Sequence, residues 1–123
     1  PEYGYISRMD LDTLTLAWRA RRAQQLRDRQ HQADVARAAA RQTARMLREE
    51  FGAEEVWLFG SLIDGPRHED FDVDLAVSGI APERYFSALA RASELVGRSV
   101  DMMPLETCAD RRRRRVLDTG ERI

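Results

Sequence analysis

The sequence has no glycine and no proline between Gly4 and Gly52. This stretch is rich in Ala, Arg, Gln and Leu, which favour helices. We therefore expect one long helix over residues 11–50, with Asp10 or Asp12 capping its start and Gly52 ending it in a left-handed conformation. At 1.5 Å per residue, an unbroken helix of this size would be about 60 Å long, far beyond a compact domain. Such a helix must bend back or meet a partner.

The middle of this helix, residues 27–32, carries no apolar residue. Apolar stripes at helical spacing lie on either side: Leu11, Leu14 and Trp18 before it, and Ala36, Ala40, Thr43 and Leu47 after it. The polar segment is either a solvated bridge in a continuous helix or the turn of a helical hairpin. Because it lacks turn-forming residues, a continuous helix with a partner is the favoured interpretation.

After Gly52 the pattern changes to short elements. We predict strands at residues 55–59, 72–77 and 99–103, helices at residues 82–96 and 111–117, and a possible edge strand at residues 121–123. The chain therefore divides into an N-terminal helical extension, residues 1–51, and a second domain, residues 52–123. The extension would serve for oligomerisation or for docking a partner.

The composition narrows the functional class. The chain has 20 Arg, no Lys and 21 acidic residues, so its net charge is -1 and favours neither nucleic acid nor a membrane surface. No apolar run approaches the roughly 18 residues of a membrane-spanning helix. Cys108 is the sole cysteine, and the start at Pro1 lacks the basic and apolar regions of a signal peptide. We expect a cytoplasmic protein without internal disulfides.

Acidic residues concentrate in residues 54–74, which hold seven carboxylates and one arginine. Asp72 and Asp74 stand two apart on a predicted strand, so both side chains leave the same face. Two like charges on one face need a counter-charge, and an oxygen-only pair suits Mg²⁺. A third acid, Asp101, interrupts another apolar strand, where an unpaired buried charge would be costly. These three carboxylates are the candidate metal ligands.

The turn at Gly60–Ser61 is the candidate phosphate-binding element. A glycine lets the backbone approach a polyphosphate closely, and exposed amides with the serine hydroxyl can donate to its oxygens. Gly60 and Gly65 have the spacing of a Walker A loop, but Pro66 and Arg67 stand where that motif requires Lys and Ser or Thr. A P-loop is therefore excluded.

Taken together, these motifs resemble those of a known family. The pair Gly60–Ser61, ten intervening residues, and then Asp72 and Asp74, followed by a later strand acid, are similar to the signature of the minimal nucleotidyltransferases of the DNA polymerase beta superfamily. The resemblance covers about residues 52–123. It implies an α+β fold in which a mixed β-sheet is flanked by helices, here with a long N-terminal helical extension.

The resemblance also implies a site and a reaction. Gly60 and Ser61 would hold ATP or another nucleoside triphosphate, and Asp72 and Asp74 would bind two Mg²⁺ ions. Asp101 would complete the metal site or act as the base. One metal would activate an incoming hydroxyl, and the other would steady the pyrophosphate leaving group.

Two positions depart from the family pattern. Asp64 stands where the family commonly has Arg, and Phe71 stands where it commonly has Ser. Arg67 would take over the electrostatic task beside the triphosphate, or activity would be weakened or redirected. Asp64 itself is most simply a turn residue beside Gly65 and Pro66.

The resemblance implies an antitoxin paired with a HEPN-domain toxin, a helical ribonuclease that it silences by transferring AMP from ATP to a tyrosine. The long helix favours a homo-oligomer or a hetero-oligomer with that partner. One alternative is a binding module that keeps the fold and neutralises a partner by occlusion. Another is an enzyme that modifies a small molecule of the aminoglycoside type. A third is RNA binding through the arginine run at residues 111–115, which is more simply a solvated helix that also faces the acidic domain.

Overall fold

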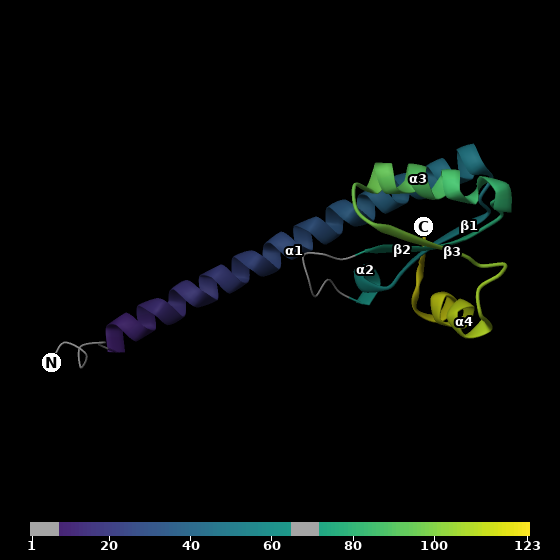
Figure 1. The fold of residues 1–123 in the computed structure, drawn as a ribbon. Coiled ribbons are helices and arrows are strands. Elements are labelled where there is room, and N and C mark those ends of the chain that lie inside the picture. Colours follow the sequence, from purple (N-terminus) through teal and green to yellow (C-terminus); the bar gives the residue numbers. More distant parts are fainter. Residues whose placement is uncertain (1–7, 65–71) are drawn as a thin grey trace.

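The computed structural model describes residues 8–64 and 72–123 (Figure 1). Its first element is one unbroken helix of 44 residues, α1, Arg8–Phe51. The continuous helix favoured by the sequence is thus confirmed, and the hairpin is wrong. Because α1 begins at Arg8, Asp10 and Asp12 lie inside the helix and do not cap it, which corrects that prediction. Gly52, with a φ of 74°, follows its end in the left-handed conformation expected.

Side chains along the polar middle of α1 bond to one another one turn apart. Gln24 Nε2 donates to Oδ1 of Asp28 at 2.8 Å, and Gln30 Nε2 donates to Oδ1 of Asp34 at 2.9 Å. Pairs at this spacing each stabilise a helix by about 0.2–0.5 kcal/mol. They help to explain why the helix continues through a segment that buries no apolar face.

Four strands form one mixed sheet in the order β3-β2-β1-β4. Their bounds are β1 Glu55–Phe59, β2 Val73–Ser78, β3 Val100–Pro104 and β4 Glu121–Arg122. β1 runs antiparallel to β2 and β4, whereas β2 and β3 run parallel. The mixed sheet implied by the resemblance is confirmed, and β4 is the expected edge strand. β2 begins one residue later than predicted, so Asp72 lies just outside it.

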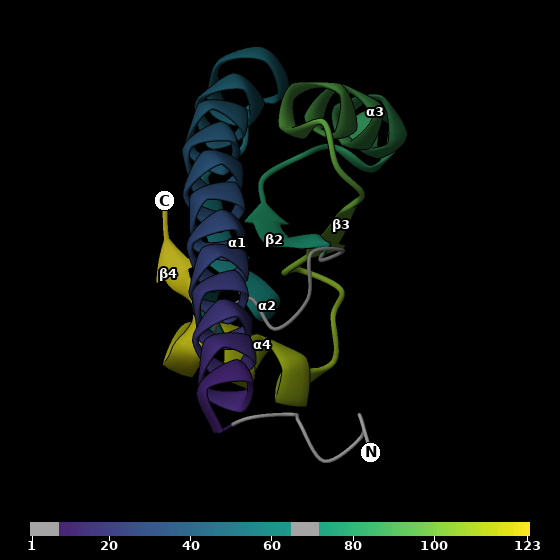
Figure 2. The same cartoon turned by 90° about the vertical axis from the view of Figure 1, so that its left-hand side faces the viewer.

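Helices cover both faces of this sheet (Figure 1 and Figure 2). α1 packs beside α3, Tyr85–Val96, on one face, and α4, Asp110–Thr119, lies on the other. A turn of 3-10 helix at Pro82–Arg84 leads into α3, and Gly97 ends it with a φ of 68°. A four-residue helix, α2, Ser61–Asp64, follows β1. The helices α3 and α4 were both predicted from the sequence, with small shifts at their ends.

The main core lies between the sheet and the helices α1 and α3. Small side chains of α1 (Ala36, Ala40 and Ala44) are buried in this core, where α1 packs closely against α3, and its Leu47 is fully buried. The strands contribute every second residue to this core: Val56, Leu58, Val73, Leu75 and Val77. Burying one such Val or Leu side chain contributes about 1.5–3 kcal/mol. The second half of α1 is therefore one layer of the core.

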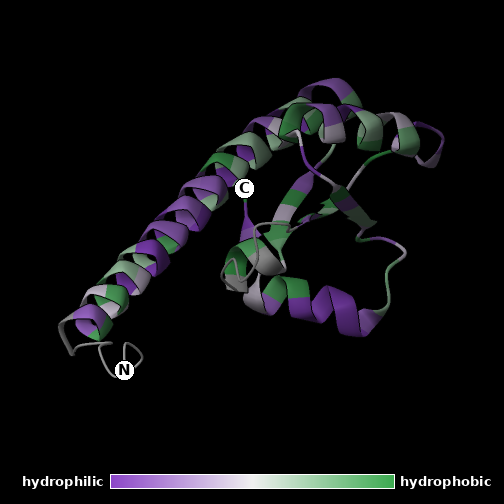
Figure 3. Cartoon of the chain, turned by 60° about the vertical axis from the view of Figure 1, so that its left-hand side comes forward, coloured by the Kyte–Doolittle hydropathy of each residue, from purple (hydrophilic) through white to green (hydrophobic). Residues whose placement is uncertain are grey.

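The first half of α1 extends beyond the sheet. We call residues 8–32 the arm, which projects beyond the rest of the molecule (Figure 1). None of the residues from Asp10 to Gln32 is buried. Apolar bands appear near the free end of the arm in Figure 3. The large exposed side chains along the arm are Leu11, Leu14, Leu16, Trp18 and Leu26. Within residues 8–64 and 72–123, no helix has both the length and the apolar character needed to span a membrane.

Candidate functional site

Two carboxylates meet on neighbouring strands. Asp74 on β2 and Asp101 on β3 are partners in the parallel register, and Phe59 at the end of β1 is opposite Asp74. Strand alternation sends Val73 and Leu75 into the core that α1 covers, so Asp74 points to the other face, which faces α4. Asp74 is half-buried and Asp101 is exposed. A ligand arriving from the α4 side can therefore reach both carboxylates.

Gly60 follows β1 and turns the chain directly beside Asp74. Its φ of 77° lies in the region that favours glycine. A Cβ atom at this position would lie only 2.1 Å from Oδ2 of Asp74, closer than any real contact. Glycine is therefore required here both for the backbone conformation and for the space that the carboxylate occupies.

Asp72 lies at the margin of this arrangement. It precedes β2 by one residue, it is exposed, and it is not among the residues that line the pocket described below. Across the described part of the chain, no three acidic, His or Cys side chains are grouped so that they could hold one metal ion. The structure thus brings Asp74 and Asp101 together without Asp72, whose role as a metal ligand stays a prediction.

Part of the predicted site lies outside the described residues. This part comprises the side chains of Ser61 and Asp64, together with residues 65–71, which include Arg67 and Phe71. The backbone of Ser61 begins α2 directly after Gly60. Nucleotide contacts from the Ser61 hydroxyl and from Arg67 therefore stay predictions.

A pocket of about 470 Å³ lies between this end of the sheet and α4. Gly60, Asp74 and Asp101 line it from the sheet side. Residues at helical spacing line it from α4: Arg112, Arg115, Val116 and Thr119. The volume falls in the usual range for small-ligand sites. Sequence reasoning missed these two arginines because it treated the run at residues 111–115 as charges spread around a helix, although their spacing with Val116 and Thr119 was a usable signal.

Tyr85, the first residue of α3, is influenced by one of these carboxylates, that of Asp101. Its hydroxyl is buried and has no hydrogen-bond partner among the described residues. Burial raises the pKa of Tyr85 above its ordinary value, and the negative charge of Asp101 raises it further. Both effects favour the protonated phenol over the phenolate.

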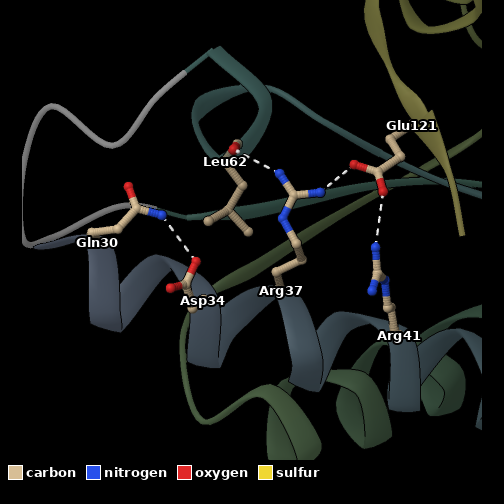
Figure 4. Close-up of polar contacts among 6 residues, drawn as sticks. All are labelled: Gln30, Asp34, Arg37, Arg41, Leu62 and Glu121. Carbon is tan, nitrogen blue, oxygen red and sulfur yellow. Dashed lines mark hydrogen bonds and ion pairs between the residues drawn. The ribbon is translucent and has the colours of Figure 1, made fainter.

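An arginine of α1 connects the turn after Gly60 to the C-terminal strand (Figure 4). Arg37 Nη2 donates to the Leu62 carbonyl at 3.4 Å, and its Nη1 pairs with the carboxylate of Glu121. Arg41 Nη2 donates to the other oxygen of that carboxylate at 3.1 Å. The hydrogen bond from Arg37 lowers the pKa of Glu121 against the opposing effect of burial, and Arg41 lowers it further. The core half of α1 thus holds both α2 and β4.

Comparison with protein families identifies the part of the chain that carries this site. Residues 41–123, more than half of the chain, match the family model described as "Polymerase beta, Nucleotidyltransferase". The matched region includes the end of α1, the whole sheet and every residue that lines the pocket. Residues 8–40, which contain the arm, precede it.

Several solved structures share the fold. A structure assigned to a minimal nucleotidyltransferase aligns with a TM-score of 0.62 and 25% identity over 72% of this chain and 92% of that chain. A toxin-antitoxin crystal structure with AMP-PNP aligns with a TM-score of 0.60 and 20% identity over 68% and 70% of the two chains. The toxin-antitoxin MntA-HepT aligns with a TM-score of 0.56 and 16% identity over 70% and 69%. No curated protein matches this sequence.

Proposed function

The chain belongs to the polymerase beta nucleotidyltransferase family, and on this basis we propose that it transfers AMP from ATP to a hydroxyl group in a Mg²⁺-dependent reaction. The acceptor that we propose is a tyrosine of a HEPN-type toxin, which the chain silences as its antitoxin. The observation that carries the proposal is the pair Asp74 and Asp101, in register beside Gly60 in one pocket. The toxin-antitoxin structures of the same fold, one with AMP-PNP, support the choice of nucleotide and partner.

The side chains of the pocket fit Mg²⁺. Asp74 and Asp101 offer only oxygen atoms, and Mg²⁺ usually takes one or two carboxylates together with phosphate oxygens and water. Asp72 would add a third carboxylate from the segment just before β2. When bound, the ion supplies positive charge that polarises the α-phosphate and stabilises the leaving group.

In this proposal, residues of the chain bind the phosphate groups and accept the proton of the acceptor. The Gly60–Ser61 turn and Arg67 hold the phosphate groups. The acceptor oxygen forms a bond to the α-phosphorus, the bond from that phosphorus to the oxygen bridging to the β-phosphate breaks, and pyrophosphate leaves. The proton of the acceptor hydroxyl passes to Asp101, whose exposed carboxylate releases it to water.

Partner recognition belongs to the arm in this proposal. Residues 1–51 would serve docking or oligomerisation and residues 52–123 the chemistry, with α1 from Ala33 onward also packing on the sheet. Leu14 and Trp18 in the arm are 63% and 64% exposed. They lie one helical turn apart, and such apolar pairs on a helix fit grooves between the helices of a partner. A helical toxin would need to offer a groove of this kind to bind the arm.

A second candidate function is a binding module that occludes its partner without chemistry. The observation that favours it is the exposed position of Asp72, which leaves two carboxylates lining the pocket among the described residues. This alternative predicts a tight complex in which no nucleotide is transferred.

Intact-mass spectrometry separates the two candidates. The protein is incubated with the helical protein encoded beside it, ATP and Mg²⁺. We expect the partner to gain the mass of one adenylyl group, that is AMP less one water, with the wild type and with Glu49→Gln, which neutralises an exposed acid of α1 far along the chain from the pocket. The gain should vanish with Asp74→Asn and with Asp101→Asn. A stable complex without any adduct would reject the enzyme and favour the binding module.

The docking role of the arm has its own test. Trp18→Ala should abolish co-purification of the partner, whereas Val35→Ala, which truncates a 56%-exposed apolar side chain on the core half of α1, should not. Neither change removes a buried contact, so the free energy of unfolding should move by no more than about 0.5 kcal/mol. Equal binding by both variants would place the partner elsewhere on the molecule.

A further inference from the structure

The five consecutive arginines of α4 divide into groups by helical spacing. Arg112 and Arg115 stand three apart, share one helix face with Val116 and Thr119, and line the pocket opposite Asp74. The other arginines do not line it. Arg111 and Arg114 lie instead along a shallow groove on the outer side of α4 that Arg115 also borders.

The arginines of α4 also differ in the hydrogen bonds and ion pairs that their guanidinium groups make within the chain. Arg113 is held within the fold, because its Nε donates to the Leu105 carbonyl at 2.9 Å and its Nη1 lies 3.7 Å from Oδ1 of Asp110. The guanidinium groups of Arg112 and Arg115 make no hydrogen bond or ion pair with any residue in the described part of the chain. Each guanidinium has five N–H donors. The pocket therefore presents donors for an anionic ligand on its α4 side.

The charges in the pocket select a particular kind of ligand. Asp74 and Asp101 lie in the wall on the sheet side, and Arg112 and Arg115 lie in the opposite wall, on α4. A ligand that contacts both walls must carry a cation toward the carboxylates and negative charge toward the arginines. A nucleoside polyphosphate with bound Mg²⁺ has this distribution. A nucleoside monophosphate has one phosphate group and cannot occupy both walls through phosphate.

We propose that Arg112 and Arg115 bind the β- and γ-phosphates of the nucleotide. This inference rests on the proposed function, because transfer of AMP requires the α-phosphate to lie at the Asp74 and Asp101 wall. The terminal phosphates then extend toward α4, where paired guanidinium groups form charge-assisted hydrogen bonds with phosphate oxygens. The same two groups stabilise the charge that develops on pyrophosphate as it leaves. They make the site selective for a triphosphate over a monophosphate.

Calorimetric titration of the full chain with Mg²⁺-ATP and with AMP tests the assignment. We expect Arg112→Gln and Arg115→Gln each to weaken Mg²⁺-ATP binding by about tenfold or more, since a hydrogen bond to a charged group contributes that much. AMP binding should change by less than about twofold. Arg114→Gln is the matched control, with the same charge change on the outer side of α4, and should bind both nucleotides like the wild type. Thermal unfolding of each variant checks that the fold is kept.

Each other outcome overturns the inference in a distinguishable way. If the wild type binds Mg²⁺-ATP and the variants at 112 and 115 bind it equally well, the arginine assignment fails while the proposed function stands. If Arg114→Gln weakens binding as much as the other two, the effect is one of overall charge and not of a site. If the variants at 112 and 115 lose affinity for ATP and for AMP equally, these arginines contact the part that the two nucleotides share and not the β- and γ-phosphates. If the wild type binds no nucleotide, the assignment and the proposed function fail together.

Discussion

Asp74 and Asp101 face one another in register on parallel strands, with no residue between them in the sheet. Adjacent strands lie about 4.8 Å apart, and like charges that are directly opposite destabilise a sheet. The fold thus places two carboxylates side by side on neighbouring strands, which is the arrangement expected where a cation is to bind.

Removing one of these charges should stabilise the protein and inactivate it. We expect Asp101→Asn to raise the free energy of unfolding in metal-free buffer by a few tenths to about 1 kcal/mol. Addition of Mg²⁺ should raise the melting temperature of the wild type and not of this variant. Urea unfolding and thermal melts with and without Mg²⁺ measure both effects, with Glu49→Gln as the control for a lost surface charge. Lower stability of Asp101→Asn would contradict the expected repulsion.

Gly60→Ala should damage the site more than the fold. Any non-glycine residue in the left-handed region costs about 1–2 kcal/mol, and this cost applies equally to Gly97→Ala, whose φ is 68°. Only Gly60→Ala also places a methyl group against the Asp74 carboxylate, because nothing lies within 4 Å of a Cβ at Gly97. We expect similar losses of stability, together with loss of Mg²⁺-dependent transfer in Gly60→Ala alone. Full activity of Gly60→Ala would show that the Asp74 carboxylate can move without consequence.

Arg37 should act as a positioning residue for the nucleotide. Arg37→Gln removes a contact to the Leu62 carbonyl next to the Gly60–Ser61 turn, whereas Arg41→Gln removes only a contact to Glu121. We expect Arg37→Gln to raise the KM for ATP about threefold to tenfold, the value of one hydrogen bond, with a smaller change in kcat. Arg41→Gln should leave KM unchanged. If both variants raise KM equally, the effect passes through Glu121 and not through the turn.

Glu121 should make stability depend on pH in the acidic range. Its pKa is lowered in the folded protein, chiefly by the hydrogen bond from Arg37, relative to an ordinary value of 4.5. The charged carboxylate therefore stabilises the fold above about pH 4.5, and this contribution is lost as the pH falls through the lowered value. Because the pair is partly exposed, Glu121→Gln should cost no more than about 1 kcal/mol near neutral pH.

Urea unfolding of the wild type and Glu121→Gln across this range measures the effect. The difference between the two proteins should shrink as the solution becomes more acidic, whereas Glu49→Gln should follow the wild type throughout. A difference that grows on acidification would have the wrong sign.

Elements that depend on neighbouring residues in the chain could be predicted from the sequence. The helix α1 followed from the absence of Gly and Pro, and β1 followed from a run of apolar residues that ends at Gly60. The spacing of Gly60 and Asp74 carried the family resemblance, which implied that both residues belong to one site, and in the structure they lie beside each other.

Contacts between distant segments could not be predicted in this way. Arg37 lies 25 residues from Leu62 and 84 residues from Glu121, and nothing in their local sequences marks them as neighbours. The placement of Arg112 in the pocket likewise depends on which face of α4 packs on the sheet. That choice is made by Val116, which is buried, and a pattern of five identical charges conceals it.

In the proposed function, partner choice and chemistry depend on separate stretches of this chain. No residue from Asp10 to Gln32 is buried, and among the described residues a hydrogen bond from Arg98 reaches Gln32 at the base of the arm, so substitutions toward its free end leave the packing around Asp74 and Gly60 untouched. After gene duplication, the sequence of the arm can therefore change without compensating substitutions at the pocket. Two paralogues in one cell could keep the same catalytic centre and still acquire mutually exclusive partners.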